Sequence, residues 1–305
     1  MSSHTGRDGA PRHRAGYVAI VGRPNVGKST LLNRMVGQKV SIVSAKPQTT
    51  RLRITGIVTR SQAQIVFVDT PGYQTAHRST LNRLMNRAVA ATIAEVNAAI
   101  WVVQALDFDE RDEAIEGLLP RELPVVLAIN KIDRVDDKKR LLPFIERLAP
   151  RRDFAAVVPV SASKGTQVEA LADAVDPLLP EGPALFDPDE ITTVNERDLA
   201  AELLREKLFR LLGDEVPYGT AVEIEHFQVQ GGLRRIGAVV VVAKNSQKGM
   251  VIGKGGEKLK SIATQARKDM ERLFGGKVYL ELWVKVRSGW AEDPAALKRL
   301  GYGPQ

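Results

Sequence analysis

The feature that most constrains this chain is a phosphate-binding loop between a predicted strand and a predicted helix. The apolar run 17–21 is followed by a G-x-x-x-x-G-K-S motif, and 30–35 continues as a helix-like stretch. In such a loop successive backbone N–H groups surround the β-phosphate, the lysine reaches the β- and γ-phosphate oxygens, and the serine hydroxyl ligates Mg²⁺. The residues assigned to nucleotide binding here are Gly22, Arg23, Pro24, Asn25, Val26, Gly27, Lys28, Ser29 and Thr30. This setting predicts an α/β fold that binds a nucleoside triphosphate.

A second segment indicates which base is bound. Asn130, Lys131 and Asp133 follow the apolar run 125–129, which predicts a buried strand. The Asp133 carboxylate can accept two hydrogen bonds from the N1–H and the exocyclic amine of guanine. Adenine carries an acceptor at N1 and would leave that carboxylate unpaired. The segment therefore predicts a preference for GTP over ATP.

Two further short motifs also follow predicted strands. Asp69, after the run 64–68, can hold Mg²⁺ through a water, and the Gly72 N–H can meet the γ-phosphate. A polar segment after the run 156–160 can present backbone N–H groups to the guanine O6. Because doubly wound sheets bind ligands beyond the carboxyl ends of their strands, all four motifs are expected at one site on a mostly parallel sheet. The residues assigned to nucleotide binding in these two motifs are Asp69, Thr70, Pro71, Gly72, Ser161, Ala162 and Ser163.

Taken in chain order, the phosphate loop, the segment 69–72, the segment 130–133 and the segment 161–163 resemble the G1, G3, G4 and G5 elements of the translation-factor-like GTPases. The resemblance implies a G2 threonine in a loop between G1 and G3, and the candidate segment is 48–51. We favour Thr50 over Thr49 as the hydroxyl that completes the Mg²⁺ shell, and a solvated polar loop is the alternative. The implied metal ligands are Ser29, Thr50 and Asp69, and the implied catalytic residues are Lys28, Thr50, Gly72 and Asn25.

Hydrolysis in this chain must use a different water-orienting group from that of the small signalling GTPases. Tyr73 stands after the G3 glycine, where those proteins carry a glutamine. The attacking water must then be held by backbone, by a partner or by a second cation. Asn25 resembles an asparagine that ligates potassium in some relatives of this class, although asparagine is also a common turn former. Activation by K⁺ is therefore one hypothesis and a simple turn is the other.

Composition limits the classes of protein that remain. At 305 residues with 44% hydrophobic content, the chain can bury a large core and is long enough for two domains. The sequence lacks cysteine, which excludes disulfides and thiolate chemistry. No apolar run reaches the 18 residues typical of a membrane span, and the first residues lack the apolar stretch of a signal peptide. A cytoplasmic location is expected.

Net positive charge is confined to the ends of the chain. Residues 16–199 contain 23 Lys and Arg against 23 Asp and Glu, whereas 200–305 contain 18 against 12. A basic segment joined to a neutral one indicates a polyanionic partner, either nucleic acid or an acidic membrane. An ordinary solubilising surface is the alternative.

A glycine-rich loop in the basic segment favours nucleic acid. The segment 253–256 matches the GXXG loop of KH domains, and apolar residues spaced three and four apart over 259–273 predict a helix directly after it. Small residues there let an RNA backbone approach the helix N-terminus. The residues assigned to RNA binding are Gly253, Lys254, Gly255, Gly256 and Lys258. The alternative is a glycine cap between two helices.

The surrounding pattern predicts a smaller α+β domain of the type II KH fold. Alternation along 278–286 places Val278, Leu280, Leu282, Val284 and Val286 on one face of a strand. The other expected elements are a helix at 198–212 and strands at 220–230 and 236–243. The expected organisation is a disordered tail at 1–15, a GTP-binding domain at 16–180, a stiff proline-rich linker at 181–195 and a KH domain at 196–305.

One GTPase domain followed by one type II KH domain resembles the bacterial Era GTPase family over 16–302. The matching segments are GRPNVGKS, QTTR, DTPG, NKID, VIGKGG and LELWVKVRSGW. The resemblance implies a GTPase that uses Mg²⁺ with GTP and GDP and binds the 3′ region of small-subunit ribosomal RNA in small ribosomal subunit assembly. It also implies some peripheral association with the membrane, and DNA is not an expected partner. Trp290 could stack on a base or close the domain core.

Two other function classes remain open from the sequence. In one, hydrolysis is negligible and the chain is an RNA-binding assembly module, which the presence of Tyr73 favours. In the other, the basic domain engages anionic lipid as a membrane-surface switch. The expected C-terminal helix near 293–300 is short and mixed in character, which disfavours lipid binding.

Overall fold

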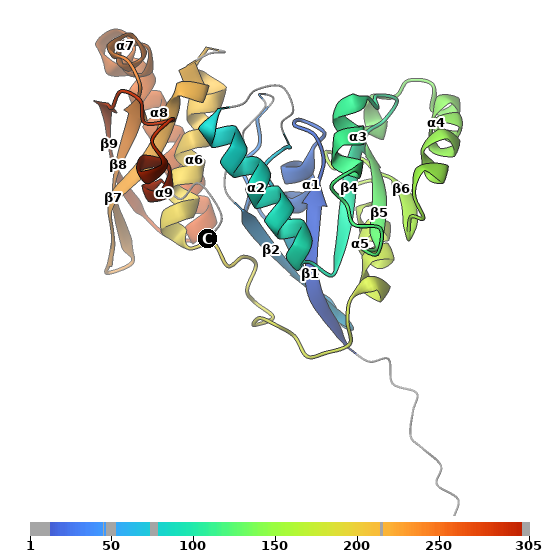
Figure 1. The fold of residues 1–305 in the computed structure, drawn as a ribbon. Coiled ribbons are helices and arrows are strands. Elements are labelled where there is room, and N and C mark those ends of the chain that lie inside the picture. The colour runs from blue at the N-terminus through green and yellow to red at the C-terminus, as the bar shows by residue number, and fades with distance from the viewer. Residues whose placement is uncertain (1–12, 45, 47–52, 74–78, 214–215, 301–305) are drawn as a thin grey trace, which may run out of the picture.

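The computed structural model describes residues 13–44, 46, 53–73, 79–213 and 216–300. They form a larger domain around a six-stranded sheet and a smaller domain around a three-stranded sheet (Figure 1). The predicted α/β domain with a mostly parallel sheet, followed by a smaller α+β domain, is confirmed. The helices and strands of the larger domain are β1 (Arg14–Val21), α1 (Lys28–Val36), β2 (Ile54–Thr59), β3 (Ala63–Asp69), α2 (Thr80–Glu95), β4 (Ala98–Gln104), α3 (Glu110–Glu116), β5 (Val125–Asn130), α4 (Leu141–Leu148), β6 (Ala156–Pro159) and α5 (Val168–Val175).

The larger sheet has the order β2-β3-β1-β4-β5-β6, and only β2 runs antiparallel to its neighbour. Its central strands are buried on both faces, as their unbroken apolar runs require. Alternate residues of β1 enter two cores: Val18 and Ile20 pack with α1 and α5, whereas Ala19 and Val21 pack with α2, α3 and α4. The parallel strands β1, β3, β4, β5 and β6 therefore end at one common edge, where all four GTPase motifs follow them.

The smaller domain consists of α6 (Glu196–Leu211), β7 (Thr220–Gln230), β8 (Leu233–Val242), α7 (Asn245–Ile252), α8 (Glu257–Phe274), β9 (Val278–Val286) and α9 (Pro294–Arg299). Its sheet has the order β7-β8-β9, with β7 and β8 antiparallel and β8 and β9 parallel. Helices α6 and α8 cover one face through a shared core. As predicted, Val278, Leu280, Leu282 and Val284 share one face of β9 and enter the core, whereas Val286, at the end of the same strand, is 37% exposed. Val286 belongs to the last residue pair of the β8–β9 ladder, whereas Val278 and Val284 are buried in the core.

The linker is held against the larger domain by hydrogen bonds. The Gln64 carboxamide accepts from the Leu185 and Phe186 N–H groups, and Thr193 and Thr55 share a hydroxyl contact of 2.6 Å. The predicted boundary of the tail at residue 15 is wrong by two residues, because β1 begins at Arg14 and pairs with β3 from that residue onward. Residues 1–12 of that tail lie outside the described residues.

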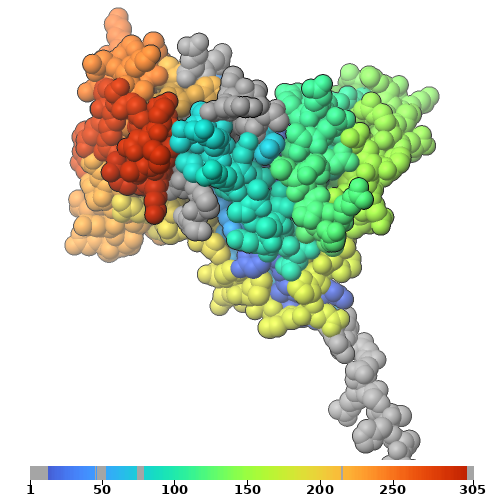
Figure 2. All heavy atoms as spheres, viewed as in Figure 1, coloured from blue at the N-terminus to red at the C-terminus, as the bar shows by residue number. Residues whose placement is uncertain are grey.

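The two domains meet at an apolar contact and at a polar one. In the apolar contact, helix α2 and helix α9 pack on the sheet face opposite α6 and α8, and Figure 2 shows α9, in red, against the cyan surface of α2. We call this group the interdomain cluster: Leu81, Met85, Ala221, Val239, Val241, Trp290, Ala296 and Leu297. In the polar contact, the Lys39 ammonium lies 2.5 Å from Glu206 and 2.9 Å from Asp269. The segment after α1 and the helix after G3 are thus both in contact with the smaller domain.

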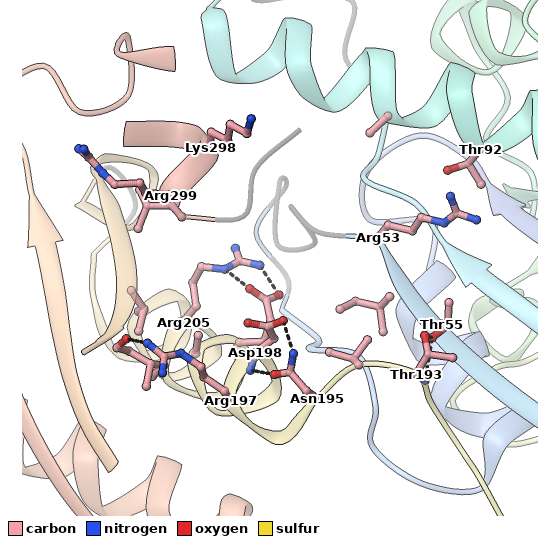
Figure 3. Close-up of a pocket in the computed structure, with 18 of the residues that line it drawn as sticks. Arg53, Thr55, Thr92, Thr193, Asn195, Arg197, Asp198, Arg205, Lys298 and Arg299 are labelled. Carbon is pink, nitrogen blue, oxygen red and sulfur yellow. Dashed lines mark hydrogen bonds and ion pairs between the residues drawn. The ribbon is translucent and has the colours of Figure 1, made fainter. Parts of the chain in front are cut away.

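A cavity of about 580 Å³ lies between these contacts (Figure 3). Arg53 and Thr55 line it from the larger domain, and Arg197 and Arg205 line it from α6. Most of its charged groups are already paired within the chain, because Arg53 meets Glu95 at 2.8 Å and Arg205 meets Glu202. The cavity is separate from the phosphate-binding loop.

Candidate functional site

The phosphate loop connects β1 to α1 and bends through three residues with positive φ. Gly22, Asn25 and Gly27 have φ values of 157°, 65° and 104°. At Gly27 a side chain would be excluded, because an added Cβ would lie 2.3 Å from the Asn130 amide nitrogen. Helix α1 begins at Lys28, so its first N–H groups point back into the loop. The arrangement is suited to binding a phosphate.

The Lys28 ammonium lies inside this loop. It donates to the carbonyl oxygens of Gly22 at 2.8 Å and Arg23 at 3.0 Å. Burial lowers the pKa of Lys28 to about 8, and the nearby Asp69 and Asp112 carboxylates oppose that change. The same cation is in place to meet phosphate oxygens.

Three oxygen-bearing side chains converge beside Lys28. The Ser29 hydroxyl donates to Asp69 Oδ2 at 2.7 Å, and the Ser41 hydroxyl donates to the same oxygen at 2.9 Å. Thr70 donates to the Ile20 carbonyl at 3.0 Å and so ties the G3 segment to β1. Sequence reasoning missed Ser41 as a site residue, since no local pattern marks it. Both threonines of the predicted G2 segment, Thr49 and Thr50, lie outside the described residues.

The G3 segment packs directly on the phosphate loop. An added Cβ on Gly72 would lie 2.9–3.0 Å from Pro24, so only glycine fits this approach. Pro71 precedes it and is buried. Tyr73 is half-buried and packs against the core formed by α2, α3 and α4.

The base-binding motifs are joined to the phosphate loop by Asn130. Its amide nitrogen donates to the Val26 carbonyl at 2.7 Å, and its oxygen accepts from the Ala162 N–H at 3.0 Å. Lys131 takes a φ of 66° and its ammonium donates to Gln104 at 2.6 Å. One side chain therefore connects the G1, G4 and G5 motifs, which are far apart in sequence.

Asp133 is held as an ionised acceptor. The Ser161 hydroxyl donates to Oδ1 at 2.6 Å and the Ser163 hydroxyl to Oδ2 at 3.2 Å. The Ser161 hydrogen bond lowers the pKa of Asp133 below its ordinary value, and burial opposes that shift less strongly. An oriented carboxylate of this kind can accept from two neighbouring N–H donors of a base.

Arg23 points away from the nucleotide pocket. Its guanidinium contacts three carboxylates around the start of α3: Asp107 at 2.5 Å, Asp109 at 3.4 Å and Asp112 at 3.1 Å. The side chain assigned to nucleotide binding therefore anchors the phosphate loop to α3, and only its backbone is left to face phosphate. No local pattern of residues indicates this contact, because 84 to 89 residues separate the partners.

The carboxylates around Arg23 make opposite contributions to the pH dependence of stability. Burial raises the pKa of Asp112 to about 6, despite the nearby Arg23, whereas hydrogen bonding to Arg111 lowers the pKa of Asp109 to about 2. Between pH 4 and 6 the folded chain keeps the Asp112 proton that an unfolded chain has released, so this group's contribution falls as pH rises. Asp109 acts the other way: its contribution is present above pH 4 and is lost as pH falls toward 2.

We therefore expect Asp112→Asn to flatten the stability profile between pH 4 and 6. Two pKa units correspond to roughly 2–3 kcal/mol, and the variant should gain on wild type by about 2 kcal/mol over this window. The measurement is the free energy of unfolding in urea at closely spaced pH values. Asp109→Asn is the matched control and should change the profile below pH 4 instead. Parallel curves for Asp112→Asn and wild type over pH 4–6 would contradict the assignment.

The predicted GXXG loop lies at the far end of the smaller domain from the larger sheet, next to α7 in Figure 1. Gly253, Gly255 and Gly256 have φ values of 73°, 58° and 82°. A Cβ on Gly253 would lie 2.7 Å from the Lys258 Cβ, so the loop requires glycine there. Lys254 and Lys258 are exposed. The helix expected after the loop is α8, with Ile262, Ala266 and Met270 buried as predicted.

Trp290 is a core residue. It is 2% exposed, belongs to the interdomain cluster, and donates from Nε1 to the Gly219 carbonyl at 3.2 Å. The base-stacking alternative for Trp290 is therefore wrong, since no face of the ring is free for a base. Among the described helices, none has the length and apolar character to cross a membrane.

Comparison with known proteins matches both halves of the chain. A family model described as a 50S ribosome-binding GTPase matches residues 17–131, and a KH domain model matches residues 215–291. GTPase Era of Nitrosomonas eutropha is 56% identical over 96% of this chain and 99% of that protein. GTPase Era of Chromobacterium violaceum is 52% identical over 94% and 97%. The chain belongs to the GTPase Era family. It is therefore a GTPase.

Solved Era structures match the full arrangement of both domains. A variant of Aquifex aeolicus Era bound to GDP.AlF4− has a TM-score of 0.92 at 38% identity, covering 95% of this chain and all of that one. Era in complex with MgGDPNP and nucleotides 1506–1542 of 16S ribosomal RNA has the same TM-score and identity, covering 96% and 100%. The similarity to the Era structures therefore includes the relative placement of the GTPase and KH domains.

Proposed function

We propose that the residues gathered at the larger sheet bind GTP and Mg²⁺ and direct hydrolysis to GDP and phosphate. The phosphate loop from Gly22 to Thr30 takes the phosphates, and Asp69, Thr70, Pro71 and Gly72 take the γ-phosphate side. The observation that carries this proposal is the convergence of Lys28 and Ser29 of the phosphate loop with Asp69 at the end of β3, supported by the Era relative that contains MgGDPNP. Hydroxyl and carboxylate oxygens are suitable donors for Mg²⁺.

In the proposed reaction water attacks the γ-phosphate in line with the leaving oxygen. Lys28 and the Gly72 N–H meet the oxygens on which charge develops, and the loop N–H groups hold the β-phosphate. Ser29 and Asp69 would hold Mg²⁺, with Thr50 of the undescribed segment as the third proposed ligand. When bound, Mg²⁺ supplies positive charge to the phosphate oxygens. Gly72 is held against Pro24, which positions its N–H relative to the phosphate loop.

Potassium is proposed as an additional activator at Asn25. The φ of 65° at this residue supports the turn-forming role, and K⁺ coordination would use the same loop position. We expect GTP hydrolysis to run several-fold faster in KCl than in NaCl at equal ionic strength, measured as phosphate release under saturating GTP. Equal rates in the two salts would leave Asn25 as a turn former only.

We also propose that the smaller domain binds the 3′ region of small-subunit ribosomal RNA and that the chain acts in small ribosomal subunit assembly. The support is the GXXG loop with its exposed Lys254 and Lys258, the basic charge of 200–305, and the Era relative that contains nucleotides 1506–1542 of 16S ribosomal RNA. A cytoplasmic location fits this partner. Peripheral binding at the inner face of the cell membrane is an additional proposal that rests on the family resemblance and on the basic charge of 200–305.

The GXXG assignment can be tested with Lys254→Asp combined with Gly255→Asp. An added Cβ at Gly255 meets no other atom within 4 Å, and aspartate tolerates its φ of 58°, so the fold should be retained. We expect RNA affinity to fall at least tenfold through charge repulsion, with GTP affinity unchanged. The measurement is fluorescence anisotropy of a labelled 3′-region oligonucleotide at stated salt. Lys138→Asp, on the surface of the larger domain, is the control, and unchanged RNA affinity in the double variant would refute the assignment.

We propose domain limits of 16–180, 181–195 and 196–305, with the first strand extended back to Arg14. The contacts that support them are the hydrogen bonds of the linker to the larger domain and the start of α6 at Glu196. Limited proteolysis should cut within 181–195 less readily than in an unanchored linker, because Gln64 and Thr55 hold this segment.

A further inference from the structure

The face of the KH sheet opposite α6 and α8 is covered along only part of its area. Val239, Val241 and Ala221 lie under the interdomain cluster. On the same face, the neighbouring strand β9 carries large side chains that reach solvent. Figure 1 shows β9 at the outer edge of the sheet. Tyr279 is 49% exposed and Trp283 is 43% exposed.

Cross-strand register places a group of ring-bearing and cationic side chains together on this face. Tyr279 pairs with Arg235, whose guanidinium lies 5.7 Å from the centre of the Tyr279 ring. His226 pairs with Gly237. The His226 ring lies directly over this glycine, because a Cβ added to Gly237 would stand only 1.9 Å from His226 Cε1. Trp283 pairs with Val239. We call Tyr279, Trp283, His226 and Arg235 the stacking face.

Most negative side chains around the stacking face are engaged by neighbours. Glu223 meets Arg287 at 2.6 Å and Glu225 meets Lys285 at 2.5 Å. Glu281, between the two rings, accepts from the Tyr279 hydroxyl at 3.2 Å. Glu223 and Glu225 are thus paired with cations, and Glu281 is held by the Tyr279 hydroxyl and lies 3.9 Å from His226 Nε2. Arg235 is an exposed cation beside the Tyr279 ring. Such a combination favours a partner that offers both planar bases and negative charge.

We propose that the stacking face binds the bases of single-stranded RNA, as a second RNA contact in addition to the GXXG loop. The inference rests on the proposed RNA-binding function and extends it to a specific surface. A sheet face with exposed aromatic side chains provides planes on which unpaired bases stack, and arginine adds a further plane. Tyr279 and Trp283 are four residues apart on one strand, about 13 Å, so they contact different nucleotides.

The position of β9 explains how one RNA strand could reach both contacts. Helix α7, which ends directly before the GXXG loop, packs against β9 from the opposite face. Because β9 is the edge strand, an RNA segment that leaves the GXXG loop can run around this one strand and reach Trp283 on the opposite face of the sheet. The basic charge of 200–305 favours such a polyanion over a neutral protein surface.

Tryptophan fluorescence gives a direct test, because the three tryptophans differ in exposure. Trp101 and Trp290 are 0% and 2% exposed, so a collisional quencher such as acrylamide reaches mainly Trp283. The probe is a synthetic RNA of the 3′ region of small-subunit ribosomal RNA. We expect bound RNA to reduce the emission and to protect it from acrylamide at least twofold. Trp283→Phe should remove this signal while retaining most of the RNA affinity.

Affinity measurements test the energetic contribution. We expect Tyr279→Ala combined with Trp283→Ala to weaken binding of this RNA at least tenfold, with GTP hydrolysis in the absence of RNA unchanged. Both side chains are partly solvated, so the fold should tolerate the change. Val229→Ala, which removes an exposed apolar group 58% accessible elsewhere in the domain, is the matched control and should bind RNA as wild type does.

The outcomes separate this inference from the function on which it rests. One outcome overturns the stacking face alone. In it, RNA binding is weakened by Lys254→Asp with Gly255→Asp, but bound RNA does not protect Trp283 from acrylamide and the double alanine variant binds as wild type does. Failure of wild type to bind the RNA at all overturns both. If the double alanine variant binds naked RNA normally but loses association with the small ribosomal subunit, the face contacts protein and the RNA proposal is wrong.

Discussion

Asp133→Asn is expected to change the nucleotide preference from guanine to xanthine. The Asp133 carboxylate is oriented by the Ser161 and Ser163 hydroxyls and stays ionised, so it accepts from the N1–H and the exocyclic amine of guanine. An amide at this position would turn one acceptor into a donor that faces the guanine amine. Xanthine carries a carbonyl at that position and restores the match. Sites built on such hydrogen bonds discriminate by about 10⁴-fold, and we expect GTP affinity to fall by roughly 10³-fold or more.

The measurement is the dissociation constant for GTP, XTP and ATP, obtained by competition with a fluorescent nucleotide. Asp136→Asn is the control, because Asp136 is exposed nearby and should leave all three constants unchanged. Guanine selectivity that survives in Asp133→Asn would show that another group recognises the base.

Glu202→Leu is expected to destabilise the KH domain by about 3–5 kcal/mol. Glu202 and Arg205 lie on α6, with side chains 4% and 1% exposed, and the carboxylate accepts two hydrogen bonds of 2.8 and 2.6 Å from the guanidinium. Arg205 also lies over the Phe209 ring at 5.6 Å. Replacing Glu202 removes the carboxylate that accepts two hydrogen bonds from the buried guanidinium, and the uncompensated desolvation of that charge is responsible for the loss.

The free energy of unfolding in guanidinium, followed by circular dichroism, tests this expectation. Glu202→Leu combined with Arg205→Met should recover most of the loss, since it removes both charges and keeps apolar volume. Glu225→Gln, in the exposed pair with Lys285, serves as the comparison and should change stability little. A double variant as unstable as the single one would indicate that the pair contributes through packing and not through charge.

The interdomain contacts give a physical route by which nucleotide state can affect the KH domain. Lys46 donates to the Leu212 carbonyl at 2.7 Å and Arg210 donates to the Val43 carbonyl at 3.0 Å, so the segment that leads into the proposed G2 loop is bound to the end of α6. Helix α2, which follows G3, supplies Leu81 and Met85 to the interdomain cluster. A ligand that changes the conformation of either segment can therefore change RNA affinity through these contacts.

The sequence alone determined the parts of this protein whose physics is local. A phosphate loop needs glycines and a lysine at fixed spacing between one strand and one helix, so Gly27 and Lys28 could be assigned without a fold. The same holds for the GXXG loop, where backbone conformation and adjacent helix are set within a few residues. Alternating or unbroken apolar runs predicted the strands, and their order predicted both domains.

Only the tertiary structure decided which distant side chains meet. Arg23 is drawn from the phosphate site by carboxylates near α3, Ser41 joins Ser29 at Asp69, and Asn130 joins three motifs. Trp290 is buried where stacking was an open alternative, while Trp283 on the preceding strand β9 stays exposed. These outcomes depend on strand register, on which sheet face a helix covers, and on how two domains dock. Each of these is set by packing between segments far apart in the chain, which the local pattern of apolar and polar residues does not specify.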